Sequence, residues 1–202
     1  NQDHHLTQLS NFFGFNCKNL KIYNSNKEIE EVNQKLVKKI KYIVICPGGN
    51  WKPKIWSSEN YNTLIKRIKK DYNHVKFILV GSKKEEVQYY RDVVKDIKNE
   101  DIINLMNQSI TLTSAYMKKS NLFIGNDSGL MHLSVSSNLT TIGLFGPTND
   151  KIYGHRGKNY FVIRTRENYE DLKKNIFDES KSFMDSIEVN DILQIIQKNR
   201  LL

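Results

Sequence analysis

A run of small and polar residues near the middle of the chain combines the residue types that bind phosphate. It reads Gly125-Asn126-Asp127-Ser128-Gly129-Leu130-Met131-His132 and stands between an apolar segment and a segment of helical pattern. Gly125 allows a sharp turn, Asp127 can cap the helix, and the amides near Ser128 would face out from its positive end. Gly129 and His132 share that face with Ser128, so these donors could converge on a diphosphate. The alternative is a simple Asp127 cap and a packed His132.

An earlier glycine-rich segment offers a second place for a phosphate. Gly48 and Gly49 follow an apolar run, and Lys52 and Lys54 come a few residues later. Glycines let backbone amides approach a ligand closely, and the lysines place cations beside whatever those amides hold. The alternative is a glycine turn with incidental lysines and a buried tryptophan, since two glycines are a weak motif.

Two further turns follow apolar runs of the same kind. Gly81 ends one run and Glu85 follows it, where its carboxylate could accept hydrogen bonds from sugar or base groups. Glu85 can equally be an acid at a helix start that complements the helix dipole. The run 145–148 (FGPT) forms a turn that would wall the same crevice, and a purely structural role for this turn is compatible with that position.

The elements that must position these turns alternate between strand and helix. Apolar runs predict the strands Tyr42–Cys46, Val75–Val80, Leu122–Ile124 and Thr140–Phe145, with short ones near 101–104 and 160–164. Helical periods between them predict the helices Ser58–Lys70, Lys84–Lys98, Thr111–Lys118 and Ser128–Ser137. This alternation predicts an α/β fold, a Rossmann-like parallel sheet with helices on both faces. The turns above would then share the carboxyl edge of the sheet, where such folds bind ligands.

The two ends of the chain differ from this alternating pattern. Leu6–Phe15 and Glu28–Lys39 look helical, so residues 1–40 are interpreted as a connector and the remnant of a preceding domain that is missing here. Residues 41–202 form the predicted Rossmann-like domain, which closes with an amphipathic helix over Val189–Lys198. The first residue is Asn1, which fits a processed, trimmed or incomplete chain.

Composition narrows the classes of function. The 202 residues carry 31 Lys and Arg against 22 Asp and Glu, a formal net charge of +9 that favours an anionic partner, although solvated lysine faces explain much of it. No Asp-x-Asp or His/Cys ligand cluster indicates a metal, and no nucleic-acid-binding motif is visible. Cys17 and Cys46 suggest no disulfide framework, and no signal or membrane span is seen, so a cytoplasmic protein is expected.

The motifs taken together resemble a known family. The order PGGNWKPKIW, VGSKKEE, IGNDSGLMHLSVSSN and TIGLFGPT is similar to the C-terminal domain of family 9 glycosyltransferases, the heptosyltransferases of the lipopolysaccharide inner core. The resemblance is good over residues 41–150 and looser elsewhere. It implies the GT-B architecture, in which two Rossmann-like domains face a cleft and the C-terminal one binds the nucleotide-sugar donor.

The resemblance also implies a role for each site residue. Lys54 would neutralise the donor diphosphate, and Asp127, Ser128, Gly129 and His132 would hold the diphosphate and sugar, with Lys54 and Asp127 acting in catalysis. Glu85 would contact the nucleoside, although the alignment can slip by one residue to Glu86. Gly48, Gly49 and Gly81 complete the expected donor site.

The implied reaction is an inverting, metal-independent transfer of a sugar, with ADP-heptose as the expected donor and a lipid-linked lipopolysaccharide core saccharide as the acceptor. No cofactor is expected, because the nucleotide-sugar is a substrate. Contact with an anionic membrane, at the inner face of the inner membrane, would follow from such an acceptor. The family's acid/base aspartate belongs to an N-terminal domain not found here, so a non-catalytic nucleotide-sugar binding module is the alternative.

Overall fold

The chain folds around one parallel sheet of six strands. The structure is a computed structural model that describes Thr7, Phe12 and residues 21–174 and 178–202. The strands lie in the order β3-β2-β1-β4-β5-β6, and every neighbouring pair is parallel. Their bounds are β1 Lys41–Cys46, β2 Val75–Leu79, β3 Ile102–Asn104, β4 Leu122–Asn126, β5 Thr141–Phe145 and β6 Tyr160–Arg164. The predicted Rossmann-like sheet is confirmed, and its strand order reverses between β1 and β4, where such folds bind ligands.

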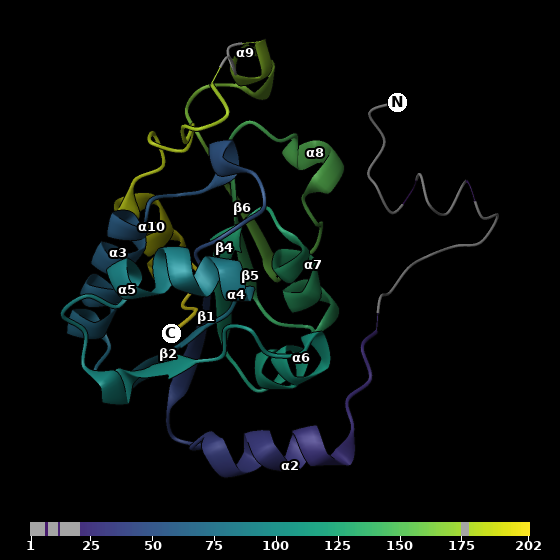
Figure 1. Ribbon diagram of the computed structural model, residues 1–202, viewed down its shortest axis with the longest axis vertical. Coiled ribbons are helices and arrows are strands. Elements are labelled where there is room, and N and C mark those ends of the chain that lie inside the picture. Colours follow the sequence, from purple (N-terminus) through teal and green to yellow (C-terminus); the bar gives the residue numbers. More distant parts are fainter. Residues whose placement is uncertain (1–6, 8–11, 13–20, 175–177) are drawn as a thin grey trace.

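Helices cover both faces of this sheet, as expected (Figure 1). On one face lie α3 (Ser58–Asp71), α5 (Arg91–Val93) and α10 (Val189–Lys198), which enclose a core containing Ile43 and Ile45 of β1. On the other lie α2 (Asn26–Lys35), α6 (Ile110–Lys118) and α7 (Gly129–Ser136), which pack on Val44 and Cys46. Successive β1 side chains therefore enter opposite cores, which requires a continuous apolar strand.

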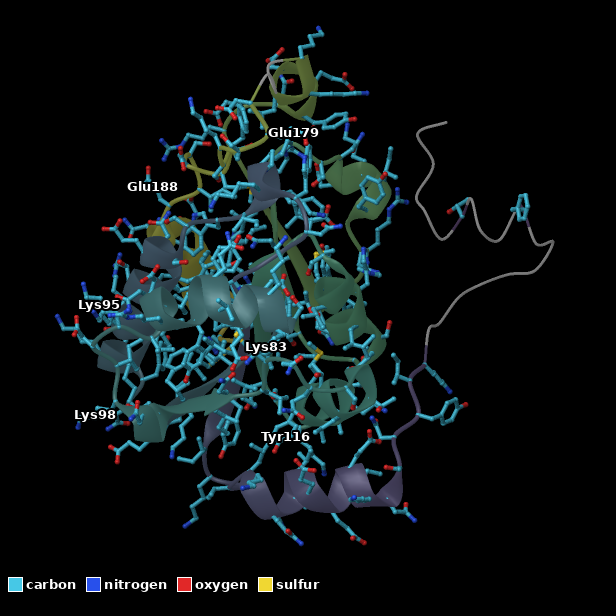
Figure 2. All side chains as sticks on the ribbon, in the orientation of Figure 1. Lys83, Lys95, Lys98, Tyr116, Glu179 and Glu188 are labelled. Carbon is cyan, nitrogen blue, oxygen red and sulfur yellow. The ribbon has the colours of Figure 1, made fainter. Side chains whose placement is uncertain are left out.

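The helix α2 ahead of the first strand packs on the domain. The sequence predicts a helix over Glu28–Lys39, whereas α2 begins and ends earlier. It begins at Asn26 because Ser25 and Glu28 form a capping box, and it ends at Lys35. Val32 is buried in the core beneath it, and Figure 2 shows Tyr116 of α6 beside α2. The other predicted helix, Leu6–Phe15, lies outside the described residues except for Thr7 and Phe12.

The predicted helix Lys84–Lys98 is found as a continuous helical run, but it contains a π turn and ends at Val93. The chain there forms α4 (Lys83–Glu85), a π turn η2 (Glu86–Tyr90) and α5, followed after an irregular stretch by the 3-10 turn η3 (Asn99–Asp101). A π turn widens the helix locally, and the positive φ of 59° at Asp96 marks the left-handed conformation in which helices end. Sequence periodicity does not reveal either feature.

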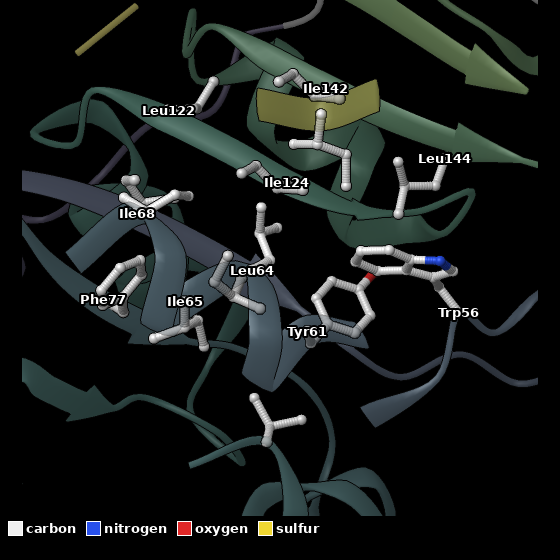
Figure 3. Close-up of a cluster of buried hydrophobic side chains, with 14 of the residues drawn as sticks. Trp56, Tyr61, Leu64, Ile65, Ile68, Phe77, Leu122, Ile124, Ile142 and Leu144 are labelled. Atoms are coloured by element: carbon white, nitrogen blue, oxygen red, sulfur yellow. The ribbon is translucent and has the colours of Figure 1, made fainter. Parts of the chain in front are cut away.

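The chain after β5 contains two short helices that the sequence did not suggest, α8 (Asp150–Tyr153) and α9 (Tyr169–Lys174). The last helix α10 has the predicted bounds, and its Ile192, Leu193 and Ile196 are buried. Trp56 ties the segment before α10 to the core, because its Nε1 donates a hydrogen bond of 2.9 Å to the Ile187 carbonyl. Figure 3 shows Trp56 edge-on to Tyr61, with ring centroids 4.9 Å apart.

Candidate functional site

The predicted phosphate-binding turns come together around one cavity of about 760 Å³. It lies beyond the carboxyl ends of β1 and β4, on either side of the point where the strand order reverses. Seven of the predicted site residues line it: Gly49, Lys54, Glu85, Asp127, Ser128, Gly129 and His132. The other two, Gly48 and Gly81, lie behind Glu85, and a Cβ on Gly48 would come within 2.5 Å of Glu85 Oε1. Gly48 therefore leaves the room that the Glu85 side chain occupies.

Ser128, not Asp127, caps helix α7, which corrects the sequence interpretation. The Ser128 side chain accepts a hydrogen bond of 3.4 Å from the Met131 amide, and its extended backbone (φ −156°, ψ 167°) marks it as the residue before the first helical turn. The Asp127 amide instead continues the strand pairing and donates to the Leu144 carbonyl at 3.1 Å. The Asp127 carboxylate is thereby left to face Lys54.

Lys54 and Asp127 form a shielded charge pair in the cavity wall. Lys54 Nζ lies 3.9 Å from Asp127 Oδ2, and the two side chains are 15% and 7% exposed. Lys54 ends the 3-10 turn η1 (Lys52–Lys54), which Pro53 helps to start. Because Gly129 and Leu130, the first residues of α7, line the same cavity, an anion there would meet both a cation and the positive end of a helix dipole.

Asn126 fixes the positions of the two main turns, a role that the sequence motifs did not indicate. It is fully buried at the end of β4, where its Oδ1 accepts from the Trp56 amide and the Tyr61 hydroxyl, each at 3.1 Å. Its Nδ2 donates to the carbonyls of Pro47 and Gly48, at 3.2 and 3.1 Å. A polar residue at the end of a buried strand is the signal that could have identified it.

Glu85 combines the two roles that the sequence left open. Its Oε2 accepts a hydrogen bond of 2.6 Å from the Ser82 amide, which makes it the acid of a capping box, and its side chain also lines the cavity. Glu86, the alternative in the alignment, contacts Lys83 and Asn104 at 2.8 Å each and is not among the lining residues.

Two more lining residues have environments that the sequence did not indicate. Burial raises the pKa of the Cys46 thiol to about 12, so it stays protonated, and its Sγ lies 3.8 Å from Ser128 Oγ. Thr148 Oγ1 is the one buried side-chain polar atom among the described residues that has no hydrogen-bond partner. A native hydroxyl in that state requires a physical explanation, and its place in the cavity wall suggests one.

The described residues contain no candidate metal-ligand cluster and no candidate membrane-spanning helix. Within residues 21–174 and 178–202, with Thr7 and Phe12, no group of three or more His, Cys, Asp or Glu side chains could hold a metal ion. No helix in this part of the chain is both long and apolar enough to cross a membrane.

Comparison with known proteins decides the family. The sequence model of glycosyltransferase family 9 (heptosyltransferase) matches residues 3–181. The chain belongs to this family. The resemblance drawn from the motifs is thus confirmed over a longer stretch than the motifs themselves cover.

Individual relatives agree with this assignment. Lipopolysaccharide heptosyltransferase 1 of Campylobacter coli is 26% identical over 174 residues, which are 85% of this chain and 50% of that protein. A family 9 glycosyltransferase of Veillonella parvula shares the fold with a TM-score of 0.73 at 22% identity, over 89% of this chain and 53% of that one. The ADP-heptose lipopolysaccharide heptosyltransferase II of E. coli shares the fold with a TM-score of 0.71 at 21% identity, over 90% of this chain and 53% of that one. The chain therefore spans about half the length of these relatives.

Proposed function

We propose that this chain is the donor-binding half of a glycosyltransferase that takes a sugar from a nucleotide-diphospho-sugar, with ADP-heptose as the donor. The observation that carries the proposal is the meeting of Lys54, Asp127 and the amino end of α7 at one cavity on the carboxyl edge of the sheet. The names of the Campylobacter coli and E. coli relatives support heptose and lipopolysaccharide as donor sugar and acceptor class.

The cavity is suited to stabilise a departing nucleoside diphosphate. In the proposed transfer an acceptor hydroxyl attacks the anomeric carbon with inversion, and the bond from that carbon to the diphosphate oxygen breaks. The negative charge that develops on the diphosphate would be stabilised by Lys54 and the α7 amides in place of a metal. Asp127 and Glu85 are carboxylates that can accept hydrogen bonds from sugar and ribose hydroxyls. The acceptor proton would pass to a base in the other half of the family's architecture.

The proposed acceptor is a lipid-linked core saccharide, so the reaction would take place at the cytoplasmic face of the inner membrane. The formal charge of +9 favours an anionic surface. Lys95 and Lys98, labelled in Figure 2, lie outside the cavity and add to this general attraction. Sedimentation with anionic vesicles at low salt tests this location, and equal binding to neutral vesicles would contradict it.

Calorimetric titration with ADP, UDP and GDP, with and without magnesium, tests the donor proposal. We expect selective, magnesium-independent binding of ADP. Lys54→Ala should weaken it by about tenfold or more, because a charge-assisted contact to the diphosphate is lost. Lys66→Ala is the matched control, since Lys66 lies on α3 outside the cavity and pairs with Asp96. Preference for UDP or GDP would change the donor, and no nucleotide binding would reject the proposal for this chain.

Asp127→Ala distinguishes the contribution of the sugar to donor binding from that of the nucleotide. We expect it to weaken binding of ADP-heptose more than binding of ADP, because a carboxylate accepts bonds from sugar hydroxyls but repels a diphosphate. Parallel titrations of both ligands measure the difference. An equal loss for the two ligands would show that Asp127 acts only by holding Lys54.

A further inference from the structure

A second histidine stands directly behind the one that lines the cavity. His132 Nδ1 lies 2.7 Å from His155 Nε2, and the two rings meet edge to face with centroids 4.9 Å apart. His132 belongs to α7, whereas His155 follows α8 in the connection from β5 to β6. The contact therefore joins two segments that the fold, and not the local sequence, brings together.

His155 is held in place from its other side. Tyr160 of β6 meets the His155 ring edge-on, with centroids 5.5 Å apart. The Tyr160 hydroxyl contacts Met131 Sδ at 3.3 Å, on the same helix as His132. Burial raises the pKa of Tyr160, so it stays a neutral phenol. His155 is thus clamped between α7 and β6, as a residue that orients another side chain must be.

A hydrogen bond between two neutral imidazoles requires one N–H and one lone pair, so it fixes the tautomer of both rings. If Nδ1 of His132 accepts, its proton is on Nε2 and the ring can donate to an anion in the cavity. If Nδ1 donates, Nε2 carries a lone pair that an anion would avoid. A diphosphate in the cavity is therefore compatible with only the first arrangement of the neutral pair.

We propose that His155 is a positioning residue, whose Nε2–H donates to His132 Nδ1 and keeps the proton of His132 on Nε2, ready for a diphosphate oxygen. The identity of the anion rests on the proposed function, whereas the tautomer is a property of the protein alone. His155 need not touch the donor, because it acts through His132.

Long-range 1H–15N spectra of the free protein test the tautomer without any ligand. We expect His132 Nδ1 to show the shift of an acceptor nitrogen and Nε2 that of an N–H. His155→Gln should keep this pattern, since its side-chain amide can still donate to Nδ1. His155→Phe keeps a ring against Tyr160 but removes the donor, so a mixture of tautomers is expected. An Nδ1–H tautomer in the unaltered protein, or an unchanged spectrum in the Phe variant, would overturn the proposal.

ADP titration tests the consequence for binding. His155→Phe should weaken affinity by about three- to tenfold, the usual worth of one hydrogen bond, and His155→Gln by about twofold at most. His74→Phe is the control, because His74 is exposed just ahead of β2. Equal affinity of the Phe variant and the unaltered protein would overturn the proposal. Failure of the unaltered protein to bind ADP would reject the proposed function instead, and the spectra would still decide the role of His155.

Discussion

In the structure Ser128 caps the helix α7, and Asp127 pairs with Lys54 at the cavity. The sequence offered Asp127 both as the cap of this helix and as a donor-binding carboxylate. Both residue types cap helices well, so type alone favoured the earlier of the two. In the fold, the pairing of β4 with β5 extends through the Asp127 amide to Leu144, which places Ser128 at the cap. The carboxylate is then available to Lys54, 3.9 Å away. One position along the chain thus separates the serine that caps α7 from the aspartate that pairs with Lys54.

The buried Thr148 hydroxyl has no hydrogen-bond partner, which should destabilise the fold, and Thr148 lines the cavity, where its hydroxyl could contact the donor. We predict that Thr148→Val raises the free energy of unfolding by about 1 kcal/mol, because it removes a buried hydroxyl without a partner. Donor affinity should fall at the same time, since the hydroxyl borders the cavity. Urea unfolding and ADP-heptose titration measure the two effects.

Thr141→Val is the control for this substitution. The Thr141 hydroxyl is buried but bonded, donating to the Leu139 carbonyl at 2.9 Å and contacting Ser134 Oγ at 2.7 Å. Its loss should destabilise the protein by about 1–2 kcal/mol. If both variants are destabilised equally, the Thr148 hydroxyl stabilises the folded protein, and the prediction is wrong.

Among the elements, the turn after β1 depends on the end of β4. Asn126 makes four hydrogen bonds: two to the carbonyls of the Pro47–Gly48 turn, one to the Trp56 amide and one to the Tyr61 hydroxyl. It therefore links the ends of two strands to the helix α3. We predict that Asn126→Ala lowers the free energy of unfolding by about 3 kcal/mol, because buried partners lose their bonds. Chemical denaturation measures this loss.

Asn62→Ala provides the comparison. Asn62 also makes two amide hydrogen bonds, to the Val93 and Lys95 carbonyls, but at a partly exposed position on α3. Water can replace its bonds, so we expect a cost of about 1 kcal/mol. A similar cost for the two variants would mean that the Asn126 network contributes no more than an ordinary surface contact.

The whole molecule should lose stability in alkaline solution. Burial raises the pKa of Cys46 from its ordinary 9.0 to about 12, and burial raises the pKa of Tyr61 above 10.0. Both groups are neutral when protonated, and the folded state binds their protons more tightly than the unfolded chain. Their contribution is therefore complete below pH 9.0 and is lost as the pH rises toward about 12.

Urea unfolding at a series of pH values between these limits measures the effect. Cys46→Ala should make the decline shallower, because it removes one of the two groups whose proton the folded state binds more tightly than the unfolded chain does. A decline of the same slope in both proteins would assign the alkaline loss to other groups.

The sequence by itself determined the α/β class, the parallel sheet, the family and seven of the residues that line the cavity. These depend on periodicity and on residues close together along the chain, such as the run from Asp127 to His132, whose helical spacing fixes a shared face. The ends of strands β1 and β4 could be predicted to meet because parallel strands present their carboxyl ends at one edge.

Only the tertiary structure decided how these residues are held. Asn126 reaches back 78 residues to Gly48, and His155 meets His132 across 23 residues, contacts that no local pattern encodes. The π turn within the predicted helix Lys84–Lys98 and the left-handed Asp96 beyond the end of α5 are likewise features that the periodic pattern does not encode. Residue type specifies which groups can take part in the chemistry, and long-range contacts specify where they stand.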